Sequence, residues 1–454
     1  MEQKISSNRL KRRHLLSQTQ YIAYGFFILI LIGTGLLMLP ISNRSGESLG
    51  MIDALFTATS ASCVTGLVVA DTWSQWTLFG QIVLICLIQI GGLGFITIGV
   101  FVSIVLRRKI GLRQRGLMQE STSALKIGGI VKLAKRIVLG TCIFEGVGAV
   151  LLSIRFVPQY GWLKGIFYGI FHAVSAFCNA GFDLMGHQQP YNSLSAYYDD
   201  WLVNLVIMLL IIIGGIGFIV WDDIYRNKWH VRKYLLQTKV VLLTTMILVF
   251  GGGFLFYLLE RNALIAEMNT SGKILTSLFS SVTARTAGFN TVDTAALSDG
   301  SKLLTIILMF IGGSPGSTAG GVKTTTVMVL LLYIHSNVKR SYSIDIFGRR
   351  LEEEAIKRAG AICTINLALA LAVSLAVMAI QPLSLSDTLF ETFSAIGTAG
   401  MTTGITRDLL PLSRLLIALL MYCGRIGSMS FALAFTRQKR AAHMKNPVET
   451  ISVG

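Results

Sequence analysis

Long stretches without charged residues dominate this 454-residue chain and limit what it can fold into. Six stretches contain no Asp, Glu, Lys or Arg: 14–43, 72–106, 201–221, 240–259, 303–322 and 359–386. Two more, 137–157 and 411–436, each contain two charged residues. A helix needs about 20 apolar residues to cross a bilayer, and each stretch supplies them. The sequence therefore predicts an all-α polytopic membrane protein with eight transmembrane helices.

Composition and charge placement exclude soluble alternatives. Hydrophobic residues make up 53% and charged residues only 14%, whereas a typical soluble domain has about 25% charged residues. The net charge of +17 does not indicate nucleic acid, because the basic residues cluster between the apolar stretches, at 4–13, 107–136, 226–239, 339–358 and 437–445. This is the positive-inside pattern. It predicts cytoplasmic termini, three cytoplasmic loops and anionic lipids as partners, with no nucleic acid.

Each predicted outer connection contains a short segment that ends near a glycine. The four segments are DALFTATSASCVTGL (53–67), GIFHAVSAFCNAGF (169–182), LTSLFSSVTARTAGF (275–289) and DTLFETFSAIGTAGM (387–401). Each begins with about 12 residues of helical character, which is too short to span a membrane. Such a segment is typical of a re-entrant pore helix followed by an extended loop, which is allowed at membrane depth only where it lines a cavity.

The segments form an internal repeat. Their glycines, Gly66, Gly181, Gly288 and Gly400, recur about every 110 residues. A second landmark follows each: GGLG (91–94), GGIG (214–217), GGS (312–314) and GRIG (424–427), with an insertion at 187–200 in the second repeat. The predicted organisation is a cytoplasmic N-terminus (1–19), repeats at 20–108, 136–226, 238–337 and 355–436, and a cytoplasmic C-terminus (437–454).

Four extended loops suit an ion pore. An ion that loses its water in a bilayer needs replacement oxygens, which rings of backbone carbonyls supply, and glycine permits the positive φ that such a run requires. Four fused helix–pore loop–helix repeats would surround one pseudo-fourfold pore. The predicted filter residues are Cys63, Val64, Thr65 and Gly66; Cys178, Asn179, Ala180 and Gly181; Arg285, Thr286, Ala287 and Gly288; and Gly397, Thr398, Ala399 and Gly400. An ordinary extracellular turn is the alternative for each loop, and Arg285 must point its side chain back into the protein.

The stretch GGSPGSTAGGVKTTT (312–326) predicts a broken helix. It differs from a phosphate-binding loop because Val322 precedes Lys323 and no strand precedes the stretch. Its glycines and proline would interrupt a helix, and the break at membrane depth suits a gate below the filter. A kink for packing is the alternative. The predicted gate residues are Gly312, Gly313, Ser314, Pro315, Gly316, Ser317, Thr318, Ala319, Gly320, Gly321, Lys323 and Arg425.

Two of the charged residues inside the predicted spans, Arg425 and Glu145, lead to specific expectations. Arg425 takes the place of Gly92, Gly215 and Gly313 in the other repeats. A buried charge is costly and usually functional, so we expect it to act as a barrier to permeation or to hydrogen-bond the broken loop. An arginine that extends to the inner interface is the alternative. Glu145 is expected to pair with a nearby basic group.

The four loop glycines, GGSPGSTAGGVKTTT and YCGRIG (422–427) resemble the Ktr/Trk/HKT superfamily of potassium transporters, specifically the membrane subunit of bacterial Ktr systems. The resemblance covers about residues 20–440. It implies a filter glycine in each repeat, an intramembrane gate at Gly312 to Gly321, and Arg425 beneath the filter. Sodium-leaning families have Ser in the first filter, so Gly66 implies potassium, although these loops differ from the T-V-G-Y-G of tetrameric channels and imply weaker selectivity. By this resemblance, the chain is expected to lack the extra N-terminal helices of the Trk branch, which favours the Ktr branch.

The same resemblance implies a mechanism and partners. It implies potassium uptake across the bacterial cytoplasmic membrane, often stimulated by sodium, by a homodimer. The chain has no Rossmann-like G-x-G-x-x-G domain, so it is expected to bind no nucleotide itself. A separate cytoplasmic RCK-type ring subunit, similar to Ktr A or C and binding ATP, ADP or NAD, would then gate it.

Two other functions, a coupled carrier and a membrane enzyme, are the alternatives to a potassium pore. Broken helices also suit a sodium- or proton-coupled carrier with alternating access, although its inverted repeats would be twofold. A membrane enzyme would need clustered His, Asp, Glu, Ser or Cys residues at membrane depth. The sequence shows no such cluster, so we expect no catalysis.

Overall fold

The computed structural model describes residues 17–108, 110–122, 128–187, 189–340, 343–428, 431 and 449. The described backbone is mostly helical, as predicted, and its two strands, β1 (Asp345–Ile346) and β2 (Arg349–Arg350), form one small antiparallel hairpin. The predicted cytoplasmic ends, 1–19 and 437–454, lie almost wholly outside the described residues.

The described helices form four successive groups along the chain. The first contains α1 (Gln18–Leu37), α2 (Met51–Ser62), α3 (Thr72–Gln75), α4 (Leu78–Leu93), α5 (Phe95–Val105) and α6 (Leu112–Thr122). The second contains α7 (Ile130–Tyr160), α8 (Trp162–Phe177), α9 (Trp201–Gly215) and α10 (Phe218–Asn227). The third contains α11 (Leu236–Met246), a π-helical turn (Ile247–Gly251), α12 (Gly252–Glu260), α13 (Thr270–Ala284), α14 (Asp299–Phe310) and α15 (Thr324–Val338). The fourth contains α16 (Glu353–Ile380), α17 (Leu385–Gly397) and α18 (Pro411–Ile426).

Two of the predicted spans are not straight. The helix pairs α4–α5 and α9–α10 bend by 94° and 95°, because Gly94 and Gly217 between them have φ of 79° and 96°, a conformation that only glycine adopts readily. By length and composition, four described helices can cross a membrane, or six if each bent pair is one span. The eight crossings therefore stay a prediction.

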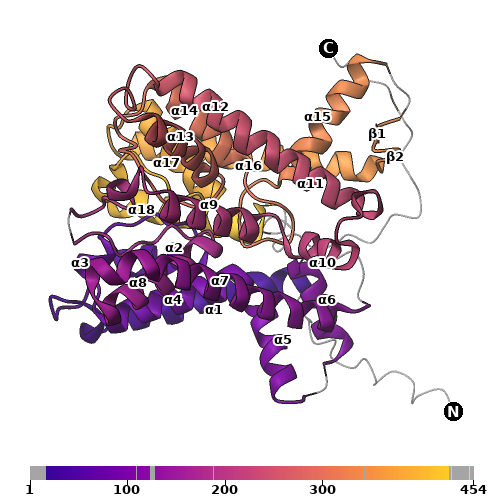
Figure 1. Cartoon of the computed structure of the whole chain (residues 1–454). Helices are drawn as coiled ribbons and strands as arrows, with labels where there is room; N and C mark the ends of the chain where they lie inside the picture. The colour runs from indigo at the N-terminus through magenta and orange to yellow at the C-terminus, as the bar shows by residue number, and fades with distance from the viewer. Residues whose placement is uncertain are drawn as a thin grey trace.

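In each group one helix of 12 to 16 residues, which we call the short helix, precedes the loop glycine and packs between two other helices. Helix α2 packs against α1 and α4, α8 against α7 and α9, α13 against α12 and α14, and α17 against α16 and α18. The groups also pack in a cycle through the contacts α4–α8, α9–α13, α14–α17 and α18–α2. Figure 1 shows α1 and α3–α8 in the lower half and α12–α17 in the upper half, with α9 and α18 between them. Because the last group closes onto the first, the four groups surround one axis.

Ion pairs occur at equivalent places in two of the four junctions. Arg414, in the first turn of α18, pairs with Asp53 in the first turn of α2. Lys302, in the first turn of α14, pairs with Asp387 in the first turn of α17, with an N–O distance of 3.3 Å. A carboxylate in the first turn of a helix also interacts favourably with the helix dipole.

The Arg414–Asp53 pair gives a test of ring closure. Its side chains are 17% and 31% exposed, so Arg414→Gln leaves a partly buried carboxylate unpaired. We expect a loss of about 1–2 kcal/mol of stability, seen as a lower melting temperature of the detergent-solubilised protein. The double variant with both charges exchanged should recover most of the loss. Arg358→Gln, which breaks an exposed pair with Glu354, is the control and should melt like the unchanged protein, and an Arg414→Gln variant that does so too would contradict the closure.

Candidate functional site

The four loop glycines lie next to one another although they are far apart in the chain. The open side of each glycine faces the backbone carbonyl oxygen that precedes the glycine of the next group: Gly66 faces Ala180, Gly181 faces Ala287, Gly288 faces Ala399, and Gly400 faces Thr65. A Cβ atom at the first three positions would lie 2.5, 2.5 and 2.9 Å from those oxygens, and at the fourth it would overlap the oxygen. No side chain fits in these gaps. The glycines and carbonyls therefore form a closed ring, which we call the glycine ring.

The backbone of the ring has the same unusual conformation in all four groups. Each glycine has positive φ, and so does the non-glycine residue two positions before it: Val64 (50°), Asn179 (58°), Thr286 (72°) and Thr398 (51°). The residue between the two does not. Non-glycine residues rarely adopt positive φ, so four at one repeat position indicate a shared requirement. Alternation of left- and right-handed residues turns successive carbonyls to the same side, whereas in a strand they alternate. This is the backbone geometry that a carbonyl-lined ion site needs.

The short helices hold the ring from behind. In three groups the N–H before the ring glycine donates to a serine carbonyl oxygen in the last turn of the short helix at 2.8 Å: Thr65 to Ser60, Ala180 to Ser175, and Ala399 to Ser394. In the third group Ala287 donates instead to Thr283 at 2.9 Å. All four short helices end at the ring, so their C-terminal ends add partial negative charge there.

Arg285 begins the third loop without facing either cavity beside the ring. Its side chain is 6% exposed, and it lines neither the outer nor the inner cavity described below. Its Nε atom has no hydrogen-bond partner among the described residues. The guanidinium group therefore lies inside the protein, away from both cavities.

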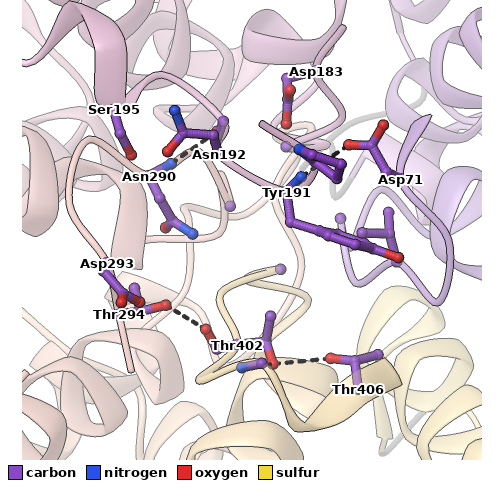
Figure 2. Close-up of a pocket in the computed structure, with 18 of the residues that line it drawn as sticks. Asp71, Asp183, Tyr191, Asn192, Ser195, Asn290, Asp293, Thr294, Thr402 and Thr406 are labelled. Carbon is purple, nitrogen blue, oxygen red and sulfur yellow. Dashed lines mark hydrogen bonds between the residues drawn. The ribbon is translucent and has the colours of Figure 1, made fainter. Parts of the chain in front are cut away.

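A cavity of about 500 Å³ lies on one side of the ring, and all four ring glycines line it. Figure 2 shows its wall, with Asp71, Asp183 and Tyr191 grouped on one side and Asp293, Thr294 and Thr402 across from them. We call this the outer cavity, because it is lined by the predicted outer connections.

Three carboxylates, Asp71, Asp183 and Asp293, give the outer cavity a negative wall. Burial raises the pKa of Asp183 to about 7, and the nearby Asp71 carboxylate adds to the rise. Sequence analysis did not select these residues. The signal was present, because Asp183 follows Gly181 at the same distance as Asn290 follows Gly288, and both line the cavity.

The predicted gate segment lies directly beneath the ring. The Thr398 side chain occupies the space beside Gly320, where a Cβ would lie 2.9 Å from its Cγ2, and a Cβ on Gly321 would lie 3.0 Å from the Gly397 carbonyl oxygen. The segment leaves α14 and returns to α15 as a loop, closed by the hydrogen bond from Gly312 N–H to the Val322 carbonyl at 2.9 Å. We call residues 312–321 the gate loop.

Side chains and backbone of the second group hold the gate loop. Ser314 N–H donates to the Gly215 carbonyl at 2.9 Å, and Phe218 N–H donates to the Gly316 carbonyl at 2.7 Å. Thr318 Oγ1 donates to the Phe177 carbonyl at 3.1 Å. The remaining predicted residues follow the same course: Gly313 accepts a hydrogen bond from Thr324 N–H, Pro315 lies against Gly217, Ser317 donates to the Ser314 carbonyl, and Ala319 is buried.

Two positively charged side chains, those of Arg425 and Lys323, donate hydrogen bonds to backbone carbonyls around the gate loop. Arg425 donates to the carbonyl oxygens of Thr318, Gly91 and Gly92, the last two at 2.5 and 2.8 Å. Lys323 donates from Nζ to the Ala319 carbonyl at 2.7 Å. Arg425 therefore connects the fourth group to the first group and to the gate loop in the third.

A second cavity, of about 220 Å³, lies on the other side of the gate loop. Its lining includes Gly316, Ser317, Ala319, Lys323 and Arg425, and none of the ring glycines. We call it the inner cavity. The ring and the gate loop thus separate two polar cavities.

The prediction for Glu145 is wrong in its partner. The Glu145 carboxylate in α7 accepts a hydrogen bond from Gln89 Nε2 at 3.1 Å and faces Cys178 Sγ at 3.8 Å. Neither partner is basic. The contact joins the first and second groups behind the ring.

Together the fold and the ring define a helical polytopic transport protein. The sequence matches the family model for TrkH, a cation transport protein, over residues 3–444. Potassium/sodium uptake protein NtpJ of Enterococcus hirae is 43% identical over 99% of this chain and 100% of its own length. Ktr system potassium uptake protein B of Bacillus subtilis is 41% identical over 93% of this chain and 94% of its own. The chain belongs to the TrkH family of cation transport proteins.

A solved structure agrees on the fold. The crystal structure of the potassium transporter TrkH from Vibrio parahaemolyticus superposes with a TM-score of 0.72, at 20% sequence identity, and covers 94% of this chain and 87% of that one. The predicted membership of the Ktr/Trk/HKT superfamily and the helical polytopic fold are thereby confirmed.

The ring predicts a strong effect of one methyl group. In Gly288→Ala the new Cβ atom would press against the Ala399 carbonyl oxygen, and residue 288 would have to keep a φ of 84°. This backbone strain costs about 1–3 kcal/mol. Because the strain distorts the glycine ring, cation uptake should fall by about tenfold or more. Gly360→Ala is the control, because a Cβ there meets nothing within 4 Å. Uptake by both variants should be measured in cells with membrane levels matched. Equal uptake by Gly288→Ala and the unchanged protein would contradict the packing of the ring.

Proposed function

We propose that this protein takes up potassium ions across the bacterial cytoplasmic membrane through the glycine ring. The observation that carries the proposal is the closed cycle in which each ring glycine faces the carbonyl oxygen before the next. Four carbonyls around one axis replace the water that an ion loses, and only a site without side chains lets four backbones come this close. The relatives support the ion, since one is named for potassium uptake and the other for potassium and sodium.

The surroundings of the ring suit a cation. Four helix C-terminal ends point toward it, and the outer cavity has three carboxylates against one basic residue among its described lining. The resemblance to the Ktr/Trk/HKT superfamily favours potassium, because the first filter has Gly66 where sodium-leaning families have Ser. Sodium is the second candidate ion. The filter consists of the sixteen loop residues predicted from the sequence, with the ring glycines at its narrowest part.

We further propose that the gate loop controls the pathway. It separates the outer and inner cavities and is held by carbonyl contacts that can be exchanged for others, notably those of Arg425 and Lys323. Its position between two polar cavities supports a gate over a kink that serves packing alone.

The proposed assembly is a homodimer with a cytoplasmic RCK-type ring that binds ATP, ADP or NAD, and with both termini of this chain in the cytoplasm. The support is the name of a relative, which places it in a Ktr system. The cyclic packing of four groups favours this pore over an alternating-access carrier built from two inverted halves.

Flux measurements in proteoliposomes test the function. Liposomes that contain the purified protein should take up potassium faster than empty liposomes, and potassium faster than sodium at equal concentration. The Gly288→Ala protein is the matched control and should lose most of this flux. Liposomes with the unchanged protein that take up neither ion faster than empty ones would contradict the proposal.

A variant of the gate should raise the potassium flux, whereas Gly288→Ala should lower it. Arg425→Gln removes the charge and the guanidinium hydrogen bonds that connect the gate loop at Thr318 with Gly91 and Gly92 of the first group, so potassium flux without a regulatory partner should rise severalfold. Arg425→Lys keeps the charge, but its donors leave a single nitrogen, whereas Arg425 reaches Thr318 from one guanidinium nitrogen and Gly91 and Gly92 from the other. It should give an intermediate flux if the hydrogen bonds hold the gate. Basal flux of Arg425→Gln at or below that of the unchanged protein would contradict the gate.

A further inference from the structure

The second group contains a connection that the other groups lack. From the ring glycine to the next long helix, the chain of the second group runs from Gly181 to Trp201, whereas the fourth runs only from Gly400 to Pro411. We call residues 189–200 of this connection the outer strap. Six of its residues line the outer cavity: Gln189, Pro190, Tyr191, Asn192, Ser193 and Ser195.

The outer strap contacts the first and third groups by hydrogen bonds. Tyr191 N–H donates to the Asp71 carboxylate at 3.0 Å, a contact that Figure 2 shows at the cavity wall. Leu194 N–H donates to the Asn290 carbonyl at 2.9 Å. An insertion with no role at the cavity would not need to reach two neighbouring groups across it.

The contact with the fourth group is of a different kind. The guanidinium carbon of Arg407 lies 4.2 Å from the centre of the Tyr191 ring, a distance at which a cation is attracted to an aromatic face. Arg407 Nε also donates to the Gly404 carbonyl at 3.3 Å. The exposed Arg407 side chain is thus held at the cavity by the outer strap on one side and by its own loop on the other.

Arg407 is the one Lys or Arg among the described residues that line the outer cavity. A positive charge there lowers the local concentration of every cation, which is unfavourable for a protein that collects them. The three carboxylates of the wall outweigh this cost for monovalent and divalent ions alike, and on their own they would concentrate divalent ions the more strongly. Because the energy of an ion in a fixed potential scales with its charge, the same arginine disfavours a divalent ion twice as strongly in free energy.

We propose that Arg407, held against Tyr191 by the outer strap, is a specificity-determining residue that limits the accumulation of divalent cations at the glycine ring by cancelling part of the negative charge of the cavity wall. The inference rests on the proposed cation uptake and adds a discrimination by charge to the discrimination by the ring. Without the positive charge, the local concentration of a monovalent ion rises by one factor, and that of a divalent ion rises by the square of that factor.

Barium is the probe, because it is divalent and nearly as large as potassium, so the ring cannot reject it by size. Inhibition of rubidium uptake by external barium should be measured at pH 8, where Asp183 is ionised, in cells that express the chain with its regulatory partner. Arg407→Gln should lower the apparent KM for rubidium roughly threefold and the barium inhibition constant roughly ninefold. Both effects should shrink at high ionic strength.

Three further variants separate charge from structure. Arg407→Lys keeps the charge and should match the unchanged protein within about twofold in barium inhibition. Arg44→Gln removes an exposed arginine that lies 4.5 Å from the Trp73 ring but does not line the cavity, and it should leave barium inhibition unchanged. Tyr191→Leu releases the guanidinium and should shift barium inhibition in the same direction as Arg407→Gln by a smaller factor. It provides the test if Arg407→Gln does not reach the membrane.

Several results would overturn the inference. The first is unchanged barium inhibition in Arg407→Gln, or in Tyr191→Leu if the Arg407→Gln protein does not reach the membrane. The second is a change of barium inhibition in Arg44→Gln as large as that in Arg407→Gln. The third is an Arg407→Lys protein whose barium inhibition matches that of Arg407→Gln. Failure of the proposed function has a different signature, because the unchanged protein would then take up no rubidium above the level of cells without it.

Discussion

The structure depends on the contact between each ring glycine and the carbonyl that precedes the glycine of the next group. This contact has no room for a Cβ atom at any of the four positions, and it requires positive φ at the glycine and two residues earlier. Everything else positions it. The short helices supply hydrogen bonds and negative ends, and each packs against a helix of the preceding group in a cycle that closes between α18 and α2. A site made of backbone can exist at membrane depth only when protein surrounds it in this way.

Sequence analysis reached the ring because its requirements are local and repeated. A glycine needed for positive φ leaves a direct mark at Gly66, Gly181, Gly288 and Gly400, and the broken helix is marked by its own glycines and proline. The sharp bends at Gly94 and Gly217 were missed, because an uncharged run is equally compatible with one straight helix and two bent ones. The negative wall of the outer cavity was missed for a different reason. Asp71, Asp183 and Asp293 are separated by long stretches of chain, and only the cyclic packing brings them together.

The four groups differ at three places: the gate loop, Arg425 and the outer strap. The third group breaks its second helix to form the gate loop, and the fourth group replaces a glycine with Arg425, which reaches both that loop and the first group. The second group adds the outer strap, which holds Arg407 of the fourth group at the outer cavity. On the side of the inner cavity, Arg425 donates hydrogen bonds to backbone carbonyls. On the side of the outer cavity, Arg407 lies against the aromatic ring of Tyr191. In the proposed function, selectivity for an ion would come from what the groups share, and control of access from what they do not.

Anomalous X-ray scattering from crystals grown in rubidium would locate the ion in the glycine ring. Rubidium is close to potassium in size and gives a signal that water does not. We expect a rubidium peak on the axis of the ring, enclosed by the carbonyl oxygens of Thr65, Ala180, Ala287 and Ala399. Rubidium bound only elsewhere, with the ring itself free of a peak, would contradict the claim that these four backbones form the ion site.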